Sequence, residues 1–158
     1  MLITKEIEID MAHRVCYHKS KCRNLHGHRY KIEIGVDDKL NETRGESDYG
    51  MVIDFSDLKQ IMMEELDEKF DHGAVFYEYD KYRPDLERMI ALNDQRADKL
   101  HFVDFMPTAE NLAKYWFELV KPRLEEKSIQ IYHIKVWETP TSTAVYTIDN
   151  WRDENVQK

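Results

Sequence analysis

The chain has 158 residues, of which 42% are hydrophobic and 34% are charged, and its formal net charge is -8 at pH 7. This length fits one domain with its own core, and the acidic charge argues against a nucleic-acid surface, which is normally basic. No apolar run approaches the roughly 20 residues that span a membrane, and the first ten residues are too acidic for a secretory signal. We therefore expect a cytoplasmic protein that binds neither nucleic acid nor membrane.

Two strands are predicted at the start of the chain, separated by a polar, basic loop over residues 14–25. From Ile3 to His13 the odd positions are mostly apolar, and from His26 to Val36 the even positions are mostly apolar. An alternation of period two indicates a strand with one buried face. Residues 37–50 are rich in turn formers and are expected to be an exposed connection.

Two helices are predicted from apolar residues at helical spacing. Ser56 is the expected N-cap of the first helix. Its buried stripe consists of Leu58, Ile61, Met62 and Leu66. Thr108 is the expected N-cap of the second helix, which Pro122 should bend or end. Its buried stripe consists of Leu112, Tyr115, Trp116, Leu119 and Val120.

The segment between the two helices is harder to interpret, because residues 74–105 mix aromatic and charged side chains. A short helix around Asp85–Leu92 is the one regular element that the pattern indicates there. Two further strands, Ile129–Glu138 and Ala144–Ile148, are joined by the turn TPTS. The remaining residues, 150–158, form a polar tail.

The order of elements is therefore strand, strand, helix, insertion, helix, strand, strand. Hairpins at both ends with helices between them predict an α+β fold, with a four-stranded antiparallel sheet and two helices on one face. We expect residues 1–149 to form a single domain that carries an insertion at about 74–105.

Three histidines fall on the buried faces of the first two strands. His13 extends the odd set of the first strand, and His26 and His28 extend the even set of the second. Residues i and i+2 of a strand lie about 6.5–7 Å apart on one face, and a hairpin would bring His13 beside them. Three neutral imidazoles with an open position are typical of catalytic zinc. Alternatively, single histidines are simply buried and hydrogen-bonded, or Cys16 or Cys22 closes a structural site.

Two other features carry chemistry. Asp71 and His72 are adjacent, and a carboxylate beside an imidazole can form a polarised proton-transfer pair, although the dipeptide alone does not establish one. Glu138 lies on the apolar face of its strand, where a carboxylate is costly unless it is paired or functional. It could pair with a buried cation, or bind a ligand that offers two N–H donors, such as a 2-amino-pyrimidinone ring.

Taken together, these segments resemble the 6-carboxytetrahydropterin synthase (QueD) / 6-pyruvoyl-tetrahydropterin synthase family. The matching segments occur in the family's order and span most of the chain. They are AHR (12–14), CRNLHGHRY (22–30), GMVIDFSDLK (50–59), FDH (70–72), PTAENLA (107–113) and VWETPTSTAVY (136–146).

The resemblance implies a fold, a metal and an assembly. The fold would be the tunnelling fold, ββααββ, whose protomers assemble into an oligomeric barrel. His13, His26 and His28 would bind one Zn2+ per subunit. The protein would be a homo-oligomer, a hexamer or tetramer, with active sites at the subunit interfaces.

The resemblance also assigns the catalytic chemistry to four residues, namely Cys22, Asp71, His72 and Glu138. The Cys22 thiol would move a proton at the substrate side chain, with Asp71 and His72 as acid/base partners. Glu138 would also anchor the pterin ring, in a pocket that Thr108 and Glu110 help to line.

The short gap between Cys22 and His26 resembles the bacterial queuosine-pathway branch of the family. The implied activity is that of a zinc-dependent carbon–carbon lyase, a 6-carboxy-5,6,7,8-tetrahydropterin synthase of queuosine (7-deazapurine) biosynthesis. It would convert the small molecule 7,8-dihydroneopterin triphosphate to 6-carboxytetrahydropterin, acetaldehyde and triphosphate. One alternative is a triphosphate lyase of the 6-pyruvoyl-tetrahydropterin synthase type, and another is a non-enzymatic zinc- or pterin-binding protein.

Overall fold

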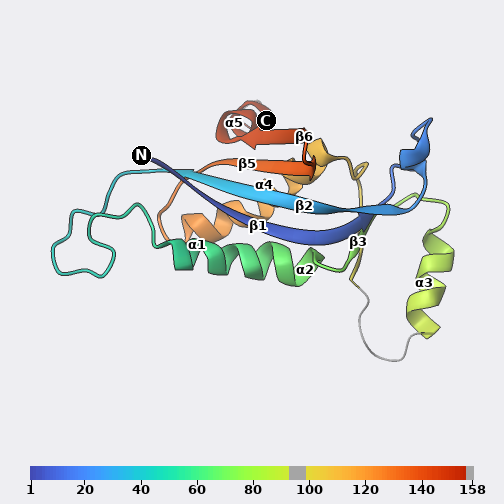
Figure 1. Ribbon diagram of the computed structural model, residues 1–158, viewed down its shortest axis with the longest axis horizontal. Helices are drawn as coiled ribbons and strands as arrows, with labels where there is room; N and C mark the ends of the chain where they lie inside the picture. Colours follow the sequence, from blue (N-terminus) through green and yellow to red (C-terminus); the bar gives the residue numbers. More distant parts are fainter. Residues whose placement is uncertain (93–98, 156–158) are drawn as a thin grey trace.

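A six-stranded sheet forms the centre of the computed structural model, which describes residues 1–92 and 99–155 (Figure 1). The strand order is β4-β3-β1-β2-β5-β6. Four strands pair antiparallel, as the sequence predicts: β1 (Leu2–His13), β2 (His26–Asp37), β5 (Ile131–Thr139) and β6 (Ser142–Thr147).

The register of the first hairpin confirms the period-two interpretation. His13 pairs directly with His26, and Met11 pairs with His28. Ile9 and Met11 of β1 and Tyr30 of β2 are buried. The buried face of each strand is therefore the face that carries the histidines.

The expected four-stranded sheet is wrong in number, because two short strands extend it. Ala12 and His13 pair in parallel with β3 (Ala74–Tyr77), and β3 pairs in parallel with β4 (Leu100–Val103). The connection between these parallel strands includes α3 (Arg83–Leu92), which matches the short helix predicted there. The sheet is mixed because β3 and β4, two four-residue strands within the expected insertion, pair in parallel. Their local sequence does not indicate this pairing. Residues 93–98 of that insertion lie outside the described residues.

The long helices cover one face of the sheet (Figure 1). α1 (Phe55–Met62) continues through a π-helical segment, η2 (Met63–Asp67), into α2 (Glu68–Phe70), and α4 (Ala109–Glu125) packs against β5 and β6. The predicted stripes supply the core, since Leu58, Leu112 and Trp116 are all fully buried. Burying each such side chain stabilises the fold by about 1.5–3 kcal/mol.

Two helix ends differ from the prediction. The N-cap of α1 is Asp54 rather than Ser56, because the Asp54 carboxylate accepts a hydrogen bond from the Ser56 backbone N–H at 2.6 Å. Thr108 does cap α4, by accepting from the Asn111 N–H. Pro122 does not end α4, which continues to Glu125, and the carbonyl of Pro122 accepts the N–H of Glu126 at 3.0 Å.

The residues expected to form a polar tail are helical as far as the structure describes them. α5 (Ile148–Asn155) follows β6 directly, and Trp151 packs against the core. Residues 156–158 lie outside the described residues. Within the described part of the chain, no helix has the length and hydrophobicity that crossing a bilayer requires.

Candidate functional site

The three predicted histidines converge at the loop end of the β1–β2 hairpin, beside the connection formed by residues 14–25. One ring nitrogen from each of His13, His26 and His28 lies within 4.8 Å of the other two. The ring centroids are 4.5 Å apart for His13 and His26, and 5.0 Å apart for His26 and His28. His13 is buried, whereas the other two are half-buried. We call this group the histidine cluster.

Backbone carbonyls fix the tautomers of two rings in the histidine cluster. His13 Nδ1 lies 2.7 Å from the carbonyl oxygen of Pro107, and His26 Nδ1 lies 2.8 Å from that of Asn24. Because a carbonyl only accepts, each Nδ1 must carry the proton, and each neutral ring therefore presents the lone pair of its Nε2. Metal-binding histidines typically donate the N–H of their other ring nitrogen to a carbonyl or carboxylate in this way.

The two Nε2 atoms of His13 and His26 lie 3.2 Å apart. Two lone pairs at this separation repel each other unless a proton or a cation lies between them. Burial lowers the pKa of His13, and the neighbouring His26 adds to this effect, so the protonated form is disfavoured. A tetrahedral zinc with Zn–N bonds of about 2.0–2.1 Å separates its ligand nitrogens by about 3.3 Å. The donor set therefore fits a zinc ion.

Glu138 lies beside the histidine cluster, as its place on the apolar face of β5 predicted. Its Oε1 is 3.6 Å from His13 Nε2. Tyr30 packs edge-on against His13 and His28, and burial, together with the Glu138 charge, raises the pKa of its phenol far above the ordinary value. The histidine cluster therefore packs against the uncharged ring of Tyr30, and the carboxylate of Glu138 lies beside it.

A hollow of about 640 Å³ opens next to the histidine cluster. Its lining combines apolar and charged side chains, namely Glu8, His28, Arg29, Lys31, Trp137, Glu138 and Pro140. This volume lies within the range of small-molecule sites, and Trp137 and Pro140 give the hollow an apolar part. The arrangement could bind a flat ring whose N–H groups face the Glu138 carboxylate.

The two cysteines do not join the histidine cluster. Cys22 lies in a single 3-10 turn, η1 (Lys21–Arg23), and is half-buried. Burial, with a further effect of the Asp80 carboxylate, raises the pKa of the Cys16 thiol, which favours its uncharged form. Among the described residues, the ligand atoms that converge come from the three histidines, so the structure provides no fourth sulfur ligand.

Asp71 and His72 form a contact pair at the end of α2. His72 Nδ1 lies 2.6 Å from Asp71 Oδ2. Partial desolvation raises the pKa of Asp71, but hydrogen bonds from the Asp10 N–H and His72, with the charge of Lys99, outweigh it and lower the pKa overall. The carboxylate therefore stays ionised, and it holds the Nδ1 proton, which leaves His72 Nε2 free to accept one.

The local backbone supports this pair. His72 has a φ of 57°, in the left-handed region that non-glycine residues rarely adopt. The next residue must be small, because a Cβ on Gly73 would lie 2.8 Å from the carbonyl oxygen of Lys99. The side chain of His72 is 79% exposed, and the pair is not part of the histidine cluster in this single chain.

Thr108 and Glu110 sit at the start of α4. The Thr108 hydroxyl is occupied in capping the helix, and Glu110 is exposed in its first turn. Thr108 directly follows Pro107, whose carbonyl orients His13, but neither Thr108 nor Glu110 lines the hollow of about 640 Å³. Sequence reasoning missed Pro107 and Asn24, because a backbone carbonyl leaves no signal in the side-chain pattern.

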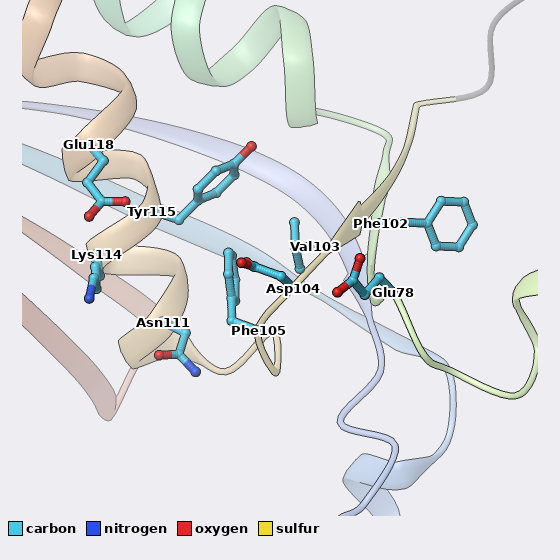
Figure 2. Close-up of a pocket in the computed structure, with 9 residues that line it drawn as sticks. All are labelled: Glu78, Phe102, Val103, Asp104, Phe105, Asn111, Lys114, Tyr115 and Glu118. Atoms are coloured by element: carbon cyan, nitrogen blue, oxygen red, sulfur yellow. The ribbon is translucent and has the colours of Figure 1, made fainter.

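A separate hollow of about 670 Å³ lies between α4 and the end of β4 (Figure 2). Phe105 and Tyr115 face each other in it, with ring centroids 5.2 Å apart. Its charged lining is mostly acidic, from Glu78, Asp104 and Glu118, while Lys114 is bound to Glu154. This hollow is poorly suited to an anionic ligand, and none of the histidine cluster lines it.

Sequence comparisons connect the chain to one family. The family model described as 6-pyruvoyl tetrahydropterin synthase matches residues 2–149. A protein of Haemophilus influenzae named 6-carboxy-5,6,7,8-tetrahydropterin synthase is 35% identical over 144 residues, which cover 91% of this chain and 96% of the relative. A protein of the same name from Aquifex aeolicus is 37% identical over 131 residues, covering 80% of this chain and 76% of the relative.

Solved structures show the same fold. An uncharacterised protein from Wolinella succinogenes superimposes with a TM-score of 0.76 at 23% identity, covering 94% of this chain and 98% of the other. The 6-pyruvoyl tetrahydropterin synthase of Caenorhabditis elegans superimposes with a TM-score of 0.63 at 24% identity, covering 93% and 94%. The α+β tunnelling fold expected from the sequence is therefore confirmed.

Proposed function

Because the chain belongs to the 6-pyruvoyl tetrahydropterin synthase family, we propose that it is a zinc-dependent 6-carboxy-5,6,7,8-tetrahydropterin synthase. It converts 7,8-dihydroneopterin triphosphate and water to 6-carboxytetrahydropterin, acetaldehyde and triphosphate. The observation that carries this proposal is the convergence of His13, His26 and His28 beside Glu138. The names of the relatives favour the carboxy product over the pyruvoyl one.

The histidine cluster binds the metal, and the carbonyls of Pro107 and Asn24 keep its Nε2 lone pairs directed at the ion. A zinc ion there would supply Lewis acidity toward the side-chain hydroxyls of the substrate and a template for their position. Tyr30 beneath the cluster excludes water from one side of the site, because its ring fills the buried face.

Glu138 anchors the pterin. Its carboxylate, half-buried at the edge of the hollow of about 640 Å³, accepts hydrogen bonds from the two N–H groups of the aminopyrimidinone ring. This places the side chain of the pterin at the histidine cluster, and holding reacting groups in register accounts for a large part of enzymatic rate enhancement. Thr108 and Glu110, at the start of α4, would contribute to the same pterin site.

Proton transfer falls to Cys22, Asp71 and His72. Cys22, in the 3-10 turn of η1, would abstract a proton from the substrate. The Asp71–His72 pair presents a free Nε2 that can return or relay protons.

We place the active site between subunits. The exposed His72 ring does not join the histidine cluster of its own chain, so a neighbouring subunit supplies it. The strand order supports an assembly, because in the described chain β1 pairs with β3 only at Ala12 and His13, which leaves most of one β1 edge open, and β6 forms the other edge. Open edges are templates for pairing with further strands. A homo-oligomeric barrel, a hexamer or tetramer, would therefore pair these edges and bring His72 to a neighbouring subunit's site.

The remaining parts of the proposal follow from the activity. The enzyme serves queuosine biosynthesis in the cytoplasm, and residues 1–149 form its single domain, of which the family model matches residues 2–149. Its partners are the small-molecule substrate and further copies of itself.

The test is to incubate the purified, zinc-loaded protein with 7,8-dihydroneopterin triphosphate and identify the products by mass. The proposal expects 6-carboxytetrahydropterin with acetaldehyde and triphosphate. A pyruvoyl product would assign the chain to the other branch of the family. No product would favour a zinc- or pterin-binding protein without turnover.

A further inference from the structure

Positive charge is concentrated in one segment of this acidic chain. Residues 14–32 contain six Lys and Arg residues and no Asp or Glu, although the whole chain has 23 basic and 31 acidic residues. The segment begins directly after His13 and includes His26 and His28. The proposed reaction chemistry uses its cysteine and histidines, but it does not explain the excess of cations.

A hollow of about 1010 Å³ lies between this segment and residues 79–82. Among the described residues, its charged and titratable lining is Arg14, Cys16, His18, Arg23 and Lys81, with no carboxylate. Tyrosine rings form much of the remaining wall. Figure 1 shows the loop before β2 and helix α3, which follows residues 79–82, at the same end of the molecule. We call this cavity the basic hollow.

Arg14 forms the fixed part of the basic hollow. It is buried, its Nη1 donates to the buried carboxylate of Asp80, and its guanidinium lies 4.4 Å from the centroid of the Tyr82 ring. Its Nε finds no hydrogen-bond partner within the described chain. The Arg14–Asp80 ion pair thus joins residues 79–82 to the end of β1. The Nε donor of Arg14 remains without a partner among the described residues.

The other cations are available to a ligand. His18 Nδ1 accepts the Ser20 backbone N–H at 3.1 Å, so its Nε2 carries the proton and acts as a donor. Arg23 and Lys81 are exposed, and in the part of the chain that the structure describes neither forms an ion pair. Positive groups without acidic partners in a concave site concentrate anions.

Two residues that line the basic hollow are close in sequence to the histidine cluster. Arg14 directly follows His13, the last residue of β1, and Asn24 orients His26 through its carbonyl. The acidic hollow of Figure 2, by contrast, would repel an anion. Of the two hollows, the basic one is therefore the one whose charge suits an anionic group of a ligand.

We propose that the basic hollow binds a polyphosphate chain, with Arg23, Lys81 and His18 as donors. The assignment of this chain to the triphosphate of the substrate rests on the proposed function, whereas the anion site itself does not. Guanidinium and ammonium groups form strong charge-assisted hydrogen bonds with phosphate oxygens.

The test is calorimetric titration of the zinc-loaded protein with sodium tripolyphosphate, with the zinc content measured before and after so that removal of metal is detected. We expect binding that weakens with added salt, and each of Arg23→Gln and Lys81→Gln to lower the affinity about tenfold. Lys19→Gln is the matched control, because it removes one charge from the same loop without lining the basic hollow. Equal losses in all three variants, or no binding by the wild type, would overturn the proposal.

A second measurement separates this proposal from the proposed function. With 7,8-dihydroneopterin triphosphate as substrate, Arg23→Gln and Lys81→Gln should raise KM about tenfold and change kcat little. Product formation with unchanged KM in both variants would refute the anion site and leave the enzymatic function intact. Tripolyphosphate binding that depends on Arg23 and Lys81, in a protein that forms no product, would refute the function and leave the anion site intact.

Discussion

The backbone carbonyl of Asp10 accepts the backbone N–H of His72 at 2.7 Å, and the N–H of Asp10 donates to the Asp71 carboxylate at 2.8 Å. Both bonds use the edge of β1 that faces away from β2. The Asp71–His72 pair is therefore held by a strand backbone rather than by a flexible loop. Because the side chain of His72 is 79% exposed in the single chain, we expect it to act at the site of a neighbouring subunit.

Mixed oligomers test this arrangement. We expect Cys22→Ala and His72→Ala to be inactive alone, while coexpression of the two variants restores activity. If each site takes Cys22 from one chain and His72 from its neighbour, about a quarter of the sites in a random mixture contain both intact residues. Purification through two different affinity tags, followed by a product assay, measures the recovery.

The control for that experiment is a mixture of Cys22→Ala with Cys22→Ala/His72→Ala. It cannot assemble an intact site and should stay inactive. Complete inactivity of the complementing mixture, with mixed oligomers present, would place Cys22 and His72 in the same chain's site.

Cys22→Ala should lose at least a hundredfold in turnover, as expected for removal of a proton-transfer group, and should retain its zinc. Cys16→Ala is the matched control, because Cys16 is also half-buried and free, and its raised pKa keeps it uncharged. It should keep most of its activity. Loss of zinc and thermal stability in Cys22→Ala would instead make Cys22 a structural ligand.

Glu138→Gln should weaken substrate binding more than metal binding. A glutamine side chain offers one acceptor and one N–H2 group, and the latter faces the N–H donors of the pterin, so a charge-assisted pair is replaced by a repulsive contact. We expect KM to rise about tenfold or more, with zinc content unchanged. An unaltered KM would remove Glu138 from the pterin site.

The acidic residue Glu65 contributes to the stability of the fold rather than to the proposed reaction. Glu65 is buried in η2, where it bonds Lys69 and accepts from Arg123 Nη1 at 2.5 Å. Burial raises the pKa of Glu65, but these two cations outweigh it and lower the pKa overall. A lowered folded-state pKa stabilises the fold above the unfolded value, and this stabilisation is lost as the pH falls through the folded value. The contribution of Glu65 is therefore complete at pH 7 and declines as the pH falls below about 4.

Glu65→Gln should therefore lower the free energy of unfolding by about 1–3 kcal/mol at pH 7, and the difference from wild type should shrink as the pH falls below about 4. Glu64→Gln is the control, since Glu64 also bonds Arg123 but is more exposed, and it should cost under about 1 kcal/mol. Denaturant titration at fixed protein concentration measures both. A difference that does not depend on pH would contradict the assigned role of the charge.

Much of the cluster could be predicted because it depends on strand periodicity. His13, His26 and His28 follow the alternation of their strands, and a hairpin register needs only local pairing. The apolar face of β5 likewise marked Glu138. These patterns involve residues close together in the chain, so they can be recognised in a single sequence.

The rest depends on contacts between distant residues. Ala74 and Val75 pair with only two residues of β1, so nothing in their local pattern indicates a strand partner. The Arg14–Asp80 pair joins positions 66 residues apart. The cap of α1 is Asp54 because its carboxylate reaches the Ser56 N–H, and both residue types are good caps in isolation.

The zinc content of the purified protein and of His26→Ala tests the central claim most directly. Elemental analysis should find about one zinc per chain in the wild type. It should find almost none in His26→Ala, while His101→Ala, which removes a histidine bonded to the Lys69 carbonyl away from the cluster, should retain it. Zinc retained at the wild-type level in His26→Ala would contradict a metal centre built on His13, His26 and His28.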